Sequence, residues 1–431
     1  MNLDEHLRSE LLSLEQAHLR RTLRVTDPIP GGGLNFAAND YLGLSHHPAL
    51  MEAAQKAAVH HGTGAGASRL VTGTSSAVLA LEEELAAWKE KEAALVFSSG
   101  YAAALGTIPA LVGKDDTVIL DKLAHASLID GARLSGATVR VFPHNHVEKL
   151  EALLQKLSST PDRGRILIVT ESIFSMDGDA ARLRELVELK DRYGAWLLVD
   201  EAHATGLYGA TGAGLLAELG LSSRVEIMMG TLSKALGSVG GYIAGSRVLI
   251  DWLTNRARSF IYSTALPPGV IAASRAAVEL ARGTEGAALR MRLRENISRF
   301  RGGLPVVWRE EESVARRSTA TSEGDTAAQR AAATTEGGTV AQHAVATSEW
   351  STTSQRAAAT LSAIQPLICG EAAAALELAA MLRERGFIVP AIRYPTVPRN
   401  SARLRVTLSA AHLTKDIDAL NAALAVAFPI R

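Results

Sequence analysis

The 431-residue sequence has little of several features that would assign it to other classes of protein. Its one cysteine, Cys369, excludes an internal disulfide framework and fits a reducing compartment. Lys plus Arg and Asp plus Glu both total 45, so no excess charge would draw the chain to nucleic acid or anionic lipid. No apolar run approaches the ~20 residues of a membrane span, and the first residues lack a signal-peptide layout. We therefore expect a cytoplasmic protein with small-molecule partners, and no nucleic-acid or membrane partner.

The phosphate loop of nucleotide-driven enzymes is also missing. The stretch DEAH at residues 200–203 follows an apolar run at 196–199, and on its own it matches the acidic box of an ATP-driven helicase. That function also needs a G-x-x-x-x-G-K-[ST] loop to hold the triphosphate, and the sequence contains none. A nucleotide-driven nucleic-acid remodeller is therefore the disfavoured alternative.

Short apolar runs alternate with helix-patterned segments from about residue 93 onwards. The runs are rich in Val, Ile and Leu on both faces and are separated by helices such as 180–193, which indicates a mostly parallel sheet covered on both sides. The pattern predicts an α/β domain, and the chain is long enough for two domains. The expected strands are residues 93–97, 117–120, 138–142, 166–170, 196–199, 226–229 and 241–244.

The last third of the chain has a different pattern. A long charged amphipathic helix is expected at 287–301, and the segments 366–369, 387–392 and 403–408 look like strands interleaved with two helices. This indicates a smaller α+β domain. We therefore expect an N-terminal arm at 1–45, a large α/β domain at 46–285 and a small domain at 286–431.

A repeat of thirteen residues interrupts the expected small domain. TSEGDTAAQRAAA at 321–333 is followed by TTEGGTVAQHAVA at 334–346 and TSEWSTTSQRAAA at 347–359. The period is too short for common solenoid units, and the composition offers little apolar area to offset the entropy of ordering. We expect a low-complexity surface insertion at about 309–360, disordered or weakly helical, with an interaction module as the alternative.

One lysine stands in an unusual setting. Lys234 lies in GTLSKALGSVGG at residues 230–241, among glycines and small hydroxyl residues that let a ligand approach the backbone closely. Asp200 follows a strand at the edge where ligands bind in doubly wound sheets. An Asp and a Lys so placed suit pyridoxal phosphate, because the lysine forms a Schiff base and the Asp keeps the pyridine nitrogen protonated.

A phosphate group would need its own cradle. Gly100 and Tyr101 stand between a strand and the helix expected at 102–111, where free backbone N–H groups and the helix dipole favour an anion. Thr231 and Ser233 add hydroxyl donors from the lysine loop. These features together predict a phosphate site.

Two histidines follow strand ends. His125 could lie flat against a pyridine ring, and His203 could reach the phenolic oxygen of that ring or orient Asp200. A structural role remains the alternative for each. No metal is expected, because the adjacent pairs at 46–47 and 60–61 diverge and no carboxylate or cysteine cluster accompanies them.

These segments together resemble the α-oxoamine synthases, a family of fold-type I pyridoxal-phosphate enzymes. The likeness runs over nearly the whole chain except the repeat. It rests on NDYLGL at 39–44, GAGASR at 64–69, SGY at 99–101, HAS at 125–127, ESIFSMDG at 171–178, DEAH at 200–203, TLSK at 231–234 and YSTALP at 262–267.

The resemblance implies roles for the matching residues. Lys234 would hold the cofactor and act as the base, Asp200 would pair with the pyridinium and His125 would stack on the ring. Ser175 and His203 would contact the phenolic oxygen. The phosphate would be held by Gly100, Tyr101 and Thr231, and by Thr264 from the partner subunit of a homodimer. Asn39 and Arg405 would bind the amino acid carboxylate, and Arg20 would lie near the acyl chain, with Arg21 and Arg24 as nearby alternatives.

The implied reaction is the condensation of an amino acid with an acyl thioester, with loss of CO₂. Within the family, IQPL at 364–367, PTVP at 395–398 and ARLRVTLSAAH at 402–412 most resemble the biotin-pathway branch, which joins L-alanine to pimeloyl-CoA or a pimeloyl-carrier protein. Glycine-using ligases such as glycine C-acetyltransferase are the alternative within the family. A binding protein on this fold without catalysis is the alternative outside it.

Overall fold

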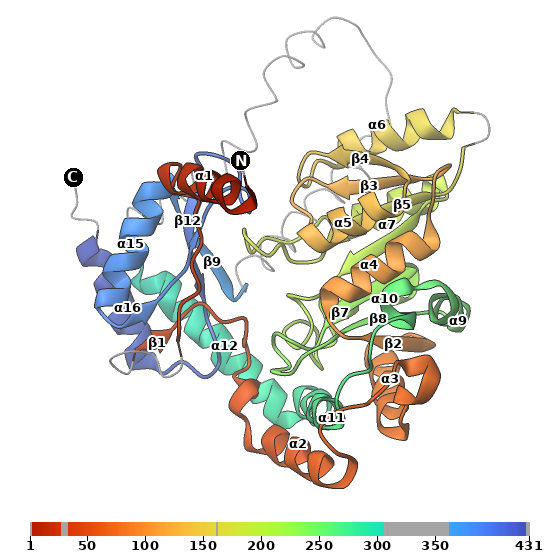
Figure 1. Cartoon of the computed structure of the whole chain (residues 1–431), viewed down its shortest axis with the longest axis horizontal. Helices are drawn as coiled ribbons and strands as arrows, with labels where there is room; N and C mark the ends of the chain where they lie inside the picture. The colour runs from red at the N-terminus through yellow and green to blue at the C-terminus, as the bar shows by residue number, and fades with distance from the viewer. Residues whose placement is uncertain (1, 27–32, 161–162, 306–307, 309–361, 428–431) are drawn as a thin grey trace, which may run out of the picture.

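A seven-stranded sheet is the centre of the larger part of the molecule (Figure 1). The computed structural model describes residues 2–26, 33–160, 163–305, 308 and 362–427. The strand order is β2-β8-β7-β6-β5-β3-β4, with β8 antiparallel to both neighbours and the other pairs parallel. The expected mostly parallel sheet is thus confirmed. Its strands are β2 (Ala93–Phe97), β3 (Thr117–Asp121), β4 (Thr138–Phe142), β5 (Ile166–Glu171), β6 (Trp196–Asp200), β7 (Ile227–Thr231) and β8 (Gly241–Gly245).

Helices cover both faces of this sheet. Alternate residues of a strand enter two separate hydrophobic clusters, so Ile166 and Ile168 of β5 pack on one face and Leu167 and Val169 on the other. This is why the strands read as unbroken apolar runs. One face packs against α3 (Ser76–Trp88), α6 (Val147–Ser158), α7 (Leu183–Tyr193), α8 (Leu215–Glu218) and α11 (Pro268–Arg282), and the other against α4 (Gly100–Leu111), α5 (Ala126–Leu134), α9 (Arg247–Arg256) and α10 (Arg258–Ile261).

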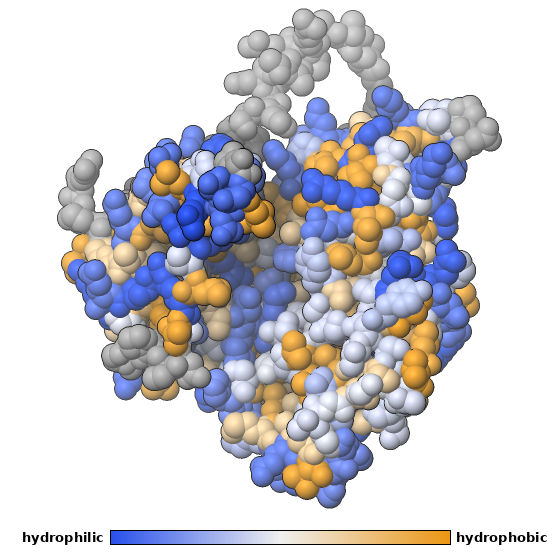
Figure 2. Space-filling view, in the orientation of Figure 1, coloured by the Kyte–Doolittle hydropathy of each residue, from blue (hydrophilic) through white to orange (hydrophobic). Residues whose placement is uncertain are grey.

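The helix α12 (Thr284–Gly303) leads to a second, smaller group of elements (Figure 1). Its three-stranded sheet has the order β11-β12-β9, with β12 antiparallel to both neighbours. Figure 2 shows the surface hollowed between this part and the part that holds the large sheet. The elements are β9 (Ile364–Gly370), α15 (Ala372–Glu384), β10 (Phe387–Ile388), β11 (Ala391–Ile392), β12 (Ala402–Thr407) and α16 (Thr414–Ala427).

The N-terminal segment joins both parts. The strand β1 (Leu34–Asn35) runs parallel to β10, and α2 (Pro48–His61) packs against α11. The first helix, α1 (Leu3–Gln16), has no buried residue. Three short helical turns complete the described chain: η2 (Leu44–His46), η3 (Arg69–Gly73) and η4 (Ser222–Arg224).

Two of the differences from the expected elements have a clear local cause. The helix expected at 180–193 begins only at Leu183, because Ala180 forms an antiparallel bridge with Ile173. The strand expected at 387–392 is split into β10 and β11, which belong to different sheets. Pro390 stands between them and has no N–H to donate to a continuous ladder.

Some expectations are not tested. The thirteen-residue repeat lies outside the described residues, and the division into an arm, a large domain and a small domain stays a prediction. Within the described ranges, no helix is long and apolar enough to cross a lipid bilayer.

Candidate active site

The ends of neighbouring parallel strands bring the predicted residues to one edge of the large sheet. Glu171 at the end of β5 is in register with Asp200 at the end of β6, and Asp200 is in turn paired with Met229 of β7. Thr231 ends β7 and leads into the lysine loop. The carboxyl ends of these strands therefore gather the candidate groups, as in other doubly wound sheets.

The lysine loop is closed by its own hydrogen bonds. The Thr231 hydroxyl donates to the Gly240 carbonyl at 2.8 Å, and the backbone N–H of Leu232 donates to the same carbonyl at 3.0 Å. Lys234 is half-buried at this site. Burial lowers the pKa of Lys234, while the charges of Asp200 and Glu171 oppose that shift. The amine can therefore lose its proton more easily than an exposed lysine.

Asp200 is almost fully buried, with 4% of its surface exposed. The backbone N–H of Ala202 donates to its Oδ1 at 2.8 Å. Burial raises the pKa of Asp200, and the charge of Lys234 opposes this. A buried carboxylate needs a cationic partner to remain ionised, and the protonated nitrogen of a pyridine ring would meet that need.

Glu171 is a candidate that the sequence reasoning missed as a site residue. Its side chain is buried, and within the described part of the chain its Oε1 atom has no hydrogen-bond partner. Burial, followed by the charge of Asp200, raises the pKa of Glu171 well above its usual range. Its only signal in the sequence is its place at the end of a strand beside that of Asp200.

The residues expected to hold the phosphate lie close together. Ser99 caps α4, its hydroxyl accepting from the N–H of Ala102 at 3.0 Å, so Gly100 lies in the first turn of that helix. A Cβ on Gly100 would lie 3.7 Å from the Thr231 Cβ, and one on Gly241 would lie 2.5 Å from the Gly100 nitrogen. The helix N-terminus and the lysine loop therefore meet without side chains between them, which fits a phosphate group.

Tyr101 follows Gly100 in α4, and His125 lies within electrostatic reach of Asp200 and Lys234. Tyr101 is 46% exposed and its hydroxyl donates to Asp130 Oδ2 at 2.6 Å. His125 caps α5, its Nδ1 lying 3.2 Å from the N–H of Ser127 and 2.8 Å from the Ser127 hydroxyl. The cap fixes the orientation of the ring. Desolvation lowers the pKa of His125, against the charge of Asp200.

His203 is joined to Tyr41, a second residue that the sequence reasoning missed. Tyr41 is buried, and its hydroxyl lies 2.6 Å from His203 Nδ1 and 3.1 Å from Asn39 Oδ1. Burial and then the charge of Lys234 lower the pKa of His203 well below its usual range, so the ring is neutral. The Tyr41 hydroxyl donates its one proton to Asn39 Oδ1, so its oxygen accepts from the Nδ1–H of His203.

Arg405 is buried on β12 and is held by the loop that follows β5. Its Nε donates to the Ser175 carbonyl at 2.7 Å, and its Nη1 donates to the Thr407 hydroxyl at 2.9 Å. These bonds fix the plane of the guanidinium and use two of its five donors, so a carboxylate could accept from the others. The structure thus joins Ser175 and Arg405, which are far apart in the sequence.

Arg20 and Thr264 are placed differently. Arg20 is exposed and pairs with Glu15 at 2.7 Å, and no described contact joins it to Lys234 or Arg405. Its neighbour Arg21 donates to the Thr396 hydroxyl at 3.3 Å. Thr264 is exposed and forms an isolated antiparallel β-bridge with Ser68. It also lines a cavity of about 650 Å³. Among the described residues, no group of three or more His, Cys, Asp or Glu side chains could hold a metal ion.

Comparisons with known proteins agree with this geometry. The family profile "Aminotransferase class I and II" matches residues 32–319. Two curated proteins called 8-amino-7-oxononanoate synthase are similar over most of their length. That of Anaeromyxobacter dehalogenans is 44% identical over 98% of this chain and 95% of its own, and that of Geobacter sulfurreducens is 42% identical over 96% of each.

Solved structures show the same fold. A variant of serine palmitoyltransferase from S. paucimobilis with a bound PLP–myriocin aldimine has a TM-score of 0.81 and 26% identity, over 99% of this chain and 98% of that one. An 8-amino-7-oxononanoate synthase from Francisella tularensis has a TM-score of 0.65 and 26% identity, over 91% and 97% of the two chains. The fold is that of a fold-type I transferase, and the cofactor is pyridoxal phosphate. The chain belongs to the class I and II aminotransferase family and, within it, to the 8-amino-7-oxononanoate synthases.

Proposed function

We infer that this enzyme condenses L-alanine with a pimeloyl thioester, releasing CO₂ and the free thiol, to form 8-amino-7-oxononanoate for biotin synthesis. The observation that carries this inference is that Lys234 interacts electrostatically with the buried side chains of Asp200 and Glu171. The chain that holds Lys234 is 44% identical, over 98% of its own length, to the 8-amino-7-oxononanoate synthase of Anaeromyxobacter dehalogenans. When bound, pyridoxal phosphate supplies an electron sink for the pair left by the broken Cα–H bond.

Lys234 is the proposed base that takes the Cα proton. Its lowered pKa leaves more of the amine free near neutral pH, so it can accept a proton at the reacting carbon. With the cofactor bound, Asp200 would stabilise a positive charge on the ring nitrogen, and His125 would support the ring by stacking. After the proton leaves, Cα attacks the thioester carbonyl and the thiolate departs. The original carboxylate is then lost as CO₂, and a proton held by Lys234 can return to Cα.

Arg405 and Asn39 are proposed to orient the amino acid. A carboxylate held by the planar Arg405 guanidinium would fix one rotation about the Cα–N bond and so would select the Cα–H bond as the one that breaks. The second bond of Tyr41, to Asn39 Oδ1 at 3.1 Å, ties Asn39 to His203. Substrate orientation and the contact to the phenolic oxygen are therefore set by one hydrogen-bonded group.

We further propose that the working enzyme is a homodimer in which Thr264 reaches the phosphate of the partner's site. Its exposure and its place on a large cavity support this proposal. Mixed dimers of Lys234→Ala and Thr264→Ala chains test it. If Thr264 acts across the interface, one site in each mixed dimer has both native residues and activity returns. If Thr264 acts within its own chain, no such site exists and activity stays low.

A side-by-side assay of amino acids and acyl donors tests the function. L-Alanine and glycine would each be paired with pimeloyl-CoA, a pimeloyl-carrier protein and acetyl-CoA. We expect turnover with L-alanine and a pimeloyl donor, and the better of the two donors identifies the thiol carrier. Preferred turnover of glycine with acetyl-CoA would contradict the proposal and indicate a glycine C-acetyltransferase.

A further inference from the structure

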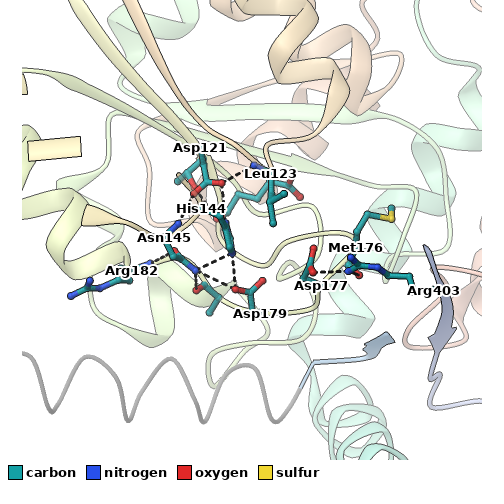
Figure 3. A network of polar contacts seen from close by, with 12 residues as sticks. Asp121, Leu123, His144, Asn145, Met176, Asp177, Asp179, Arg182 and Arg403 are labelled. Carbon is teal, nitrogen blue, oxygen red and sulfur yellow. Dashed lines mark hydrogen bonds and ion pairs between the residues drawn. The ribbon is translucent and has the colours of Figure 1, made fainter. Parts of the chain in front are cut away.

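His144 lies outside the residues assigned above, in the turn after β4, and carboxylates hold its ring at both nitrogens (Figure 3). Nδ1 is 2.9 Å from Asp121 Oδ1, and Nε2 is 2.8 Å from Asp179 Oδ2. The Phe174 ring packs edge-to-face with the His144 ring, with 4.3 Å between the centroids and 87° between the planes. We name Asp121, His144 and Asp179 the His144 clamp.

The ring of His144 donates at both ends and is therefore an imidazolium. Carboxylates accept hydrogen bonds, and only the protonated ring has an N–H on each nitrogen. Burial alone would lower the pKa of His144, but the hydrogen bonds to Asp121 and Asp179 raise it to about 10. The clamp is thus charged throughout the neutral range.

The neighbouring Asn145 supports the clamp. Its backbone N–H donates to Asp121 Oδ2 at 3.1 Å, and its Nδ2 donates to Asp179 Oδ2 at 3.2 Å and to the Ala180 carbonyl at 3.0 Å. Asn145 has a φ of 56°, a left-handed conformation that asparagine adopts more readily than most residues. One short turn therefore anchors both carboxylates.

The clamp holds the base of a closed loop, residues 172–181. The bridge between Ile173 and Ala180 closes this loop, and the N–H of Phe174 donates to the Asp179 carbonyl at 2.9 Å. At the tip, the Ser175 carbonyl accepts from Arg405 at 2.7 Å. Arg403 on the same strand as Arg405 bonds Asp177 Oδ1 at 2.6 Å, as Figure 3 shows. A continuous set of bonds therefore leads from His144 to Arg405.

We propose that His144 is a positioning residue that acts through the 172–181 loop to hold the Arg405 guanidinium where the amino acid carboxylate binds. This rests on the role given to Arg405 in the proposed function. Without the imidazolium, buried Asp121 has no cation beside it and the base of the loop loses its anchor. A small displacement of an orienting group weakens binding and turnover strongly. The loss should therefore fall on the amino acid rather than on the acyl donor.

His144→Gln tests the proposal, with His146→Gln as the matched control in the same turn. His146 pairs with exposed Glu148 at 3.0 Å and is not part of the clamp. We expect His144→Gln to raise KM for L-alanine about tenfold or more, with KM for the acyl donor changed less than about twofold. Hydrogen exchange of the backbone amides of residues 172–181 should become faster. His146→Gln should leave all three measurements unchanged.

The double variant Asp121→Asn, His144→Gln guards against loss of folding, because it leaves no uncompensated buried charge. It should recover part of the alanine affinity that His144→Gln loses. An unchanged KM for L-alanine, or equal rises for both substrates, would overturn the proposal, as would unchanged loop exchange. Arg405→Lys separates the role of His144 from the role of Arg405. If Arg405→Lys raises KM for L-alanine and His144→Gln does not, the positioning role of His144 is wrong and the role of Arg405 stands. If Arg405→Lys leaves KM for L-alanine unchanged, both roles are wrong.

Discussion

Single residues at the candidate site include buried titratable groups with few hydrogen-bond partners. Asp200 and Glu171 are 4% and 2% exposed, and both act on Lys234. Groups with pKa values displaced by burial and by specific neighbours are typical of sites where protons move. The activity of the site should therefore depend on the protonation states of these side chains.

Asp200→Asn should slow the removal of the Cα proton more than it weakens binding. The amide keeps the shape of the side chain but cannot stabilise a protonated ring nitrogen. We expect a fall on the order of a hundredfold in the exchange of the Cα–H of L-alanine with deuterated water. Asp251→Asn, an exposed change on α9, is the control. An unchanged exchange rate in the Asp200 variant would show that this carboxylate is not the partner of the ring.

Tyr41→Phe should free His203 to adopt either tautomer. The variant removes only the hydroxyl that lies 2.6 Å from His203 Nδ1. The bond to His203, the one that fixes the tautomer, is worth about 0.5–1.5 kcal/mol, so its loss should lower kcat by up to about tenfold. The absorbance of the bound cofactor, followed against pH, should shift as well. Tyr193→Phe, whose hydroxyl bonds Glu151 at 3.4 Å, is the control, and an identical response of the two variants would refute the role of Tyr41.

At the scale of elements, loops between the strands and helices do the positioning. Ser175, Asp177 and Asp179 all belong to the short loop after β5; the first two bond arginines of β12, and Asp179 bonds His144 in the turn after β4. The loop after β7 is closed in the same way by Thr231. The site therefore depends on loops that a rigid sheet holds in place.

The His144 clamp should make stability fall as the pH rises. The pKa of His144 is raised from 6.5 to about 10 in the folded chain. The clamp therefore stabilises the fold fully below about pH 6.5, and this stabilisation is lost as the pH rises through about 10. The titratable groups that face the ring are the carboxylates of Asp121 and Asp179. Urea unfolding at pH 7 and pH 10 should therefore show a larger fall for the wild type than for His144→Gln. Equal falls would mean that His144 is not charged in the folded chain.

At the scale of the whole molecule, the sequence predicts the large sheet and the lysine loop well. Continuous apolar strands and the glycines around Lys234 are local signals, and the structure has each expected strand of the large sheet within two residues. The missed features are contacts between distant segments. Tyr41 meets His203 across 162 positions, and β1 pairs with β10 across most of the chain. No local pattern reports such a pairing.

The buried ion pair of Lys89 and Glu201 should matter to the stability of the whole chain. The two side chains are 1% exposed, and Lys89 also donates to the Thr205 hydroxyl at 2.9 Å. Lys89→Met leaves a buried charge without its cation, which costs about 3–5 kcal/mol. Urea denaturation measures this, with Lys56→Met as the control, since the pair of Lys56 with Glu52 is exposed. Equal stability of the two variants would show that the buried pair of Lys89 and Glu201 does not matter to the stability of the chain.

The central claim is that Lys234 holds the cofactor. Borohydride reduction of the enzyme loaded with pyridoxal phosphate, followed by digestion and mass spectrometry, tests this claim directly, with Lys234→Ala treated in parallel. We predict that the wild type carries the reduced cofactor on the peptide that contains Lys234, and that folded Lys234→Ala is colourless, inactive and unlabelled. Label on another lysine, such as Lys122, or activity in the Lys234→Ala variant, would contradict the account.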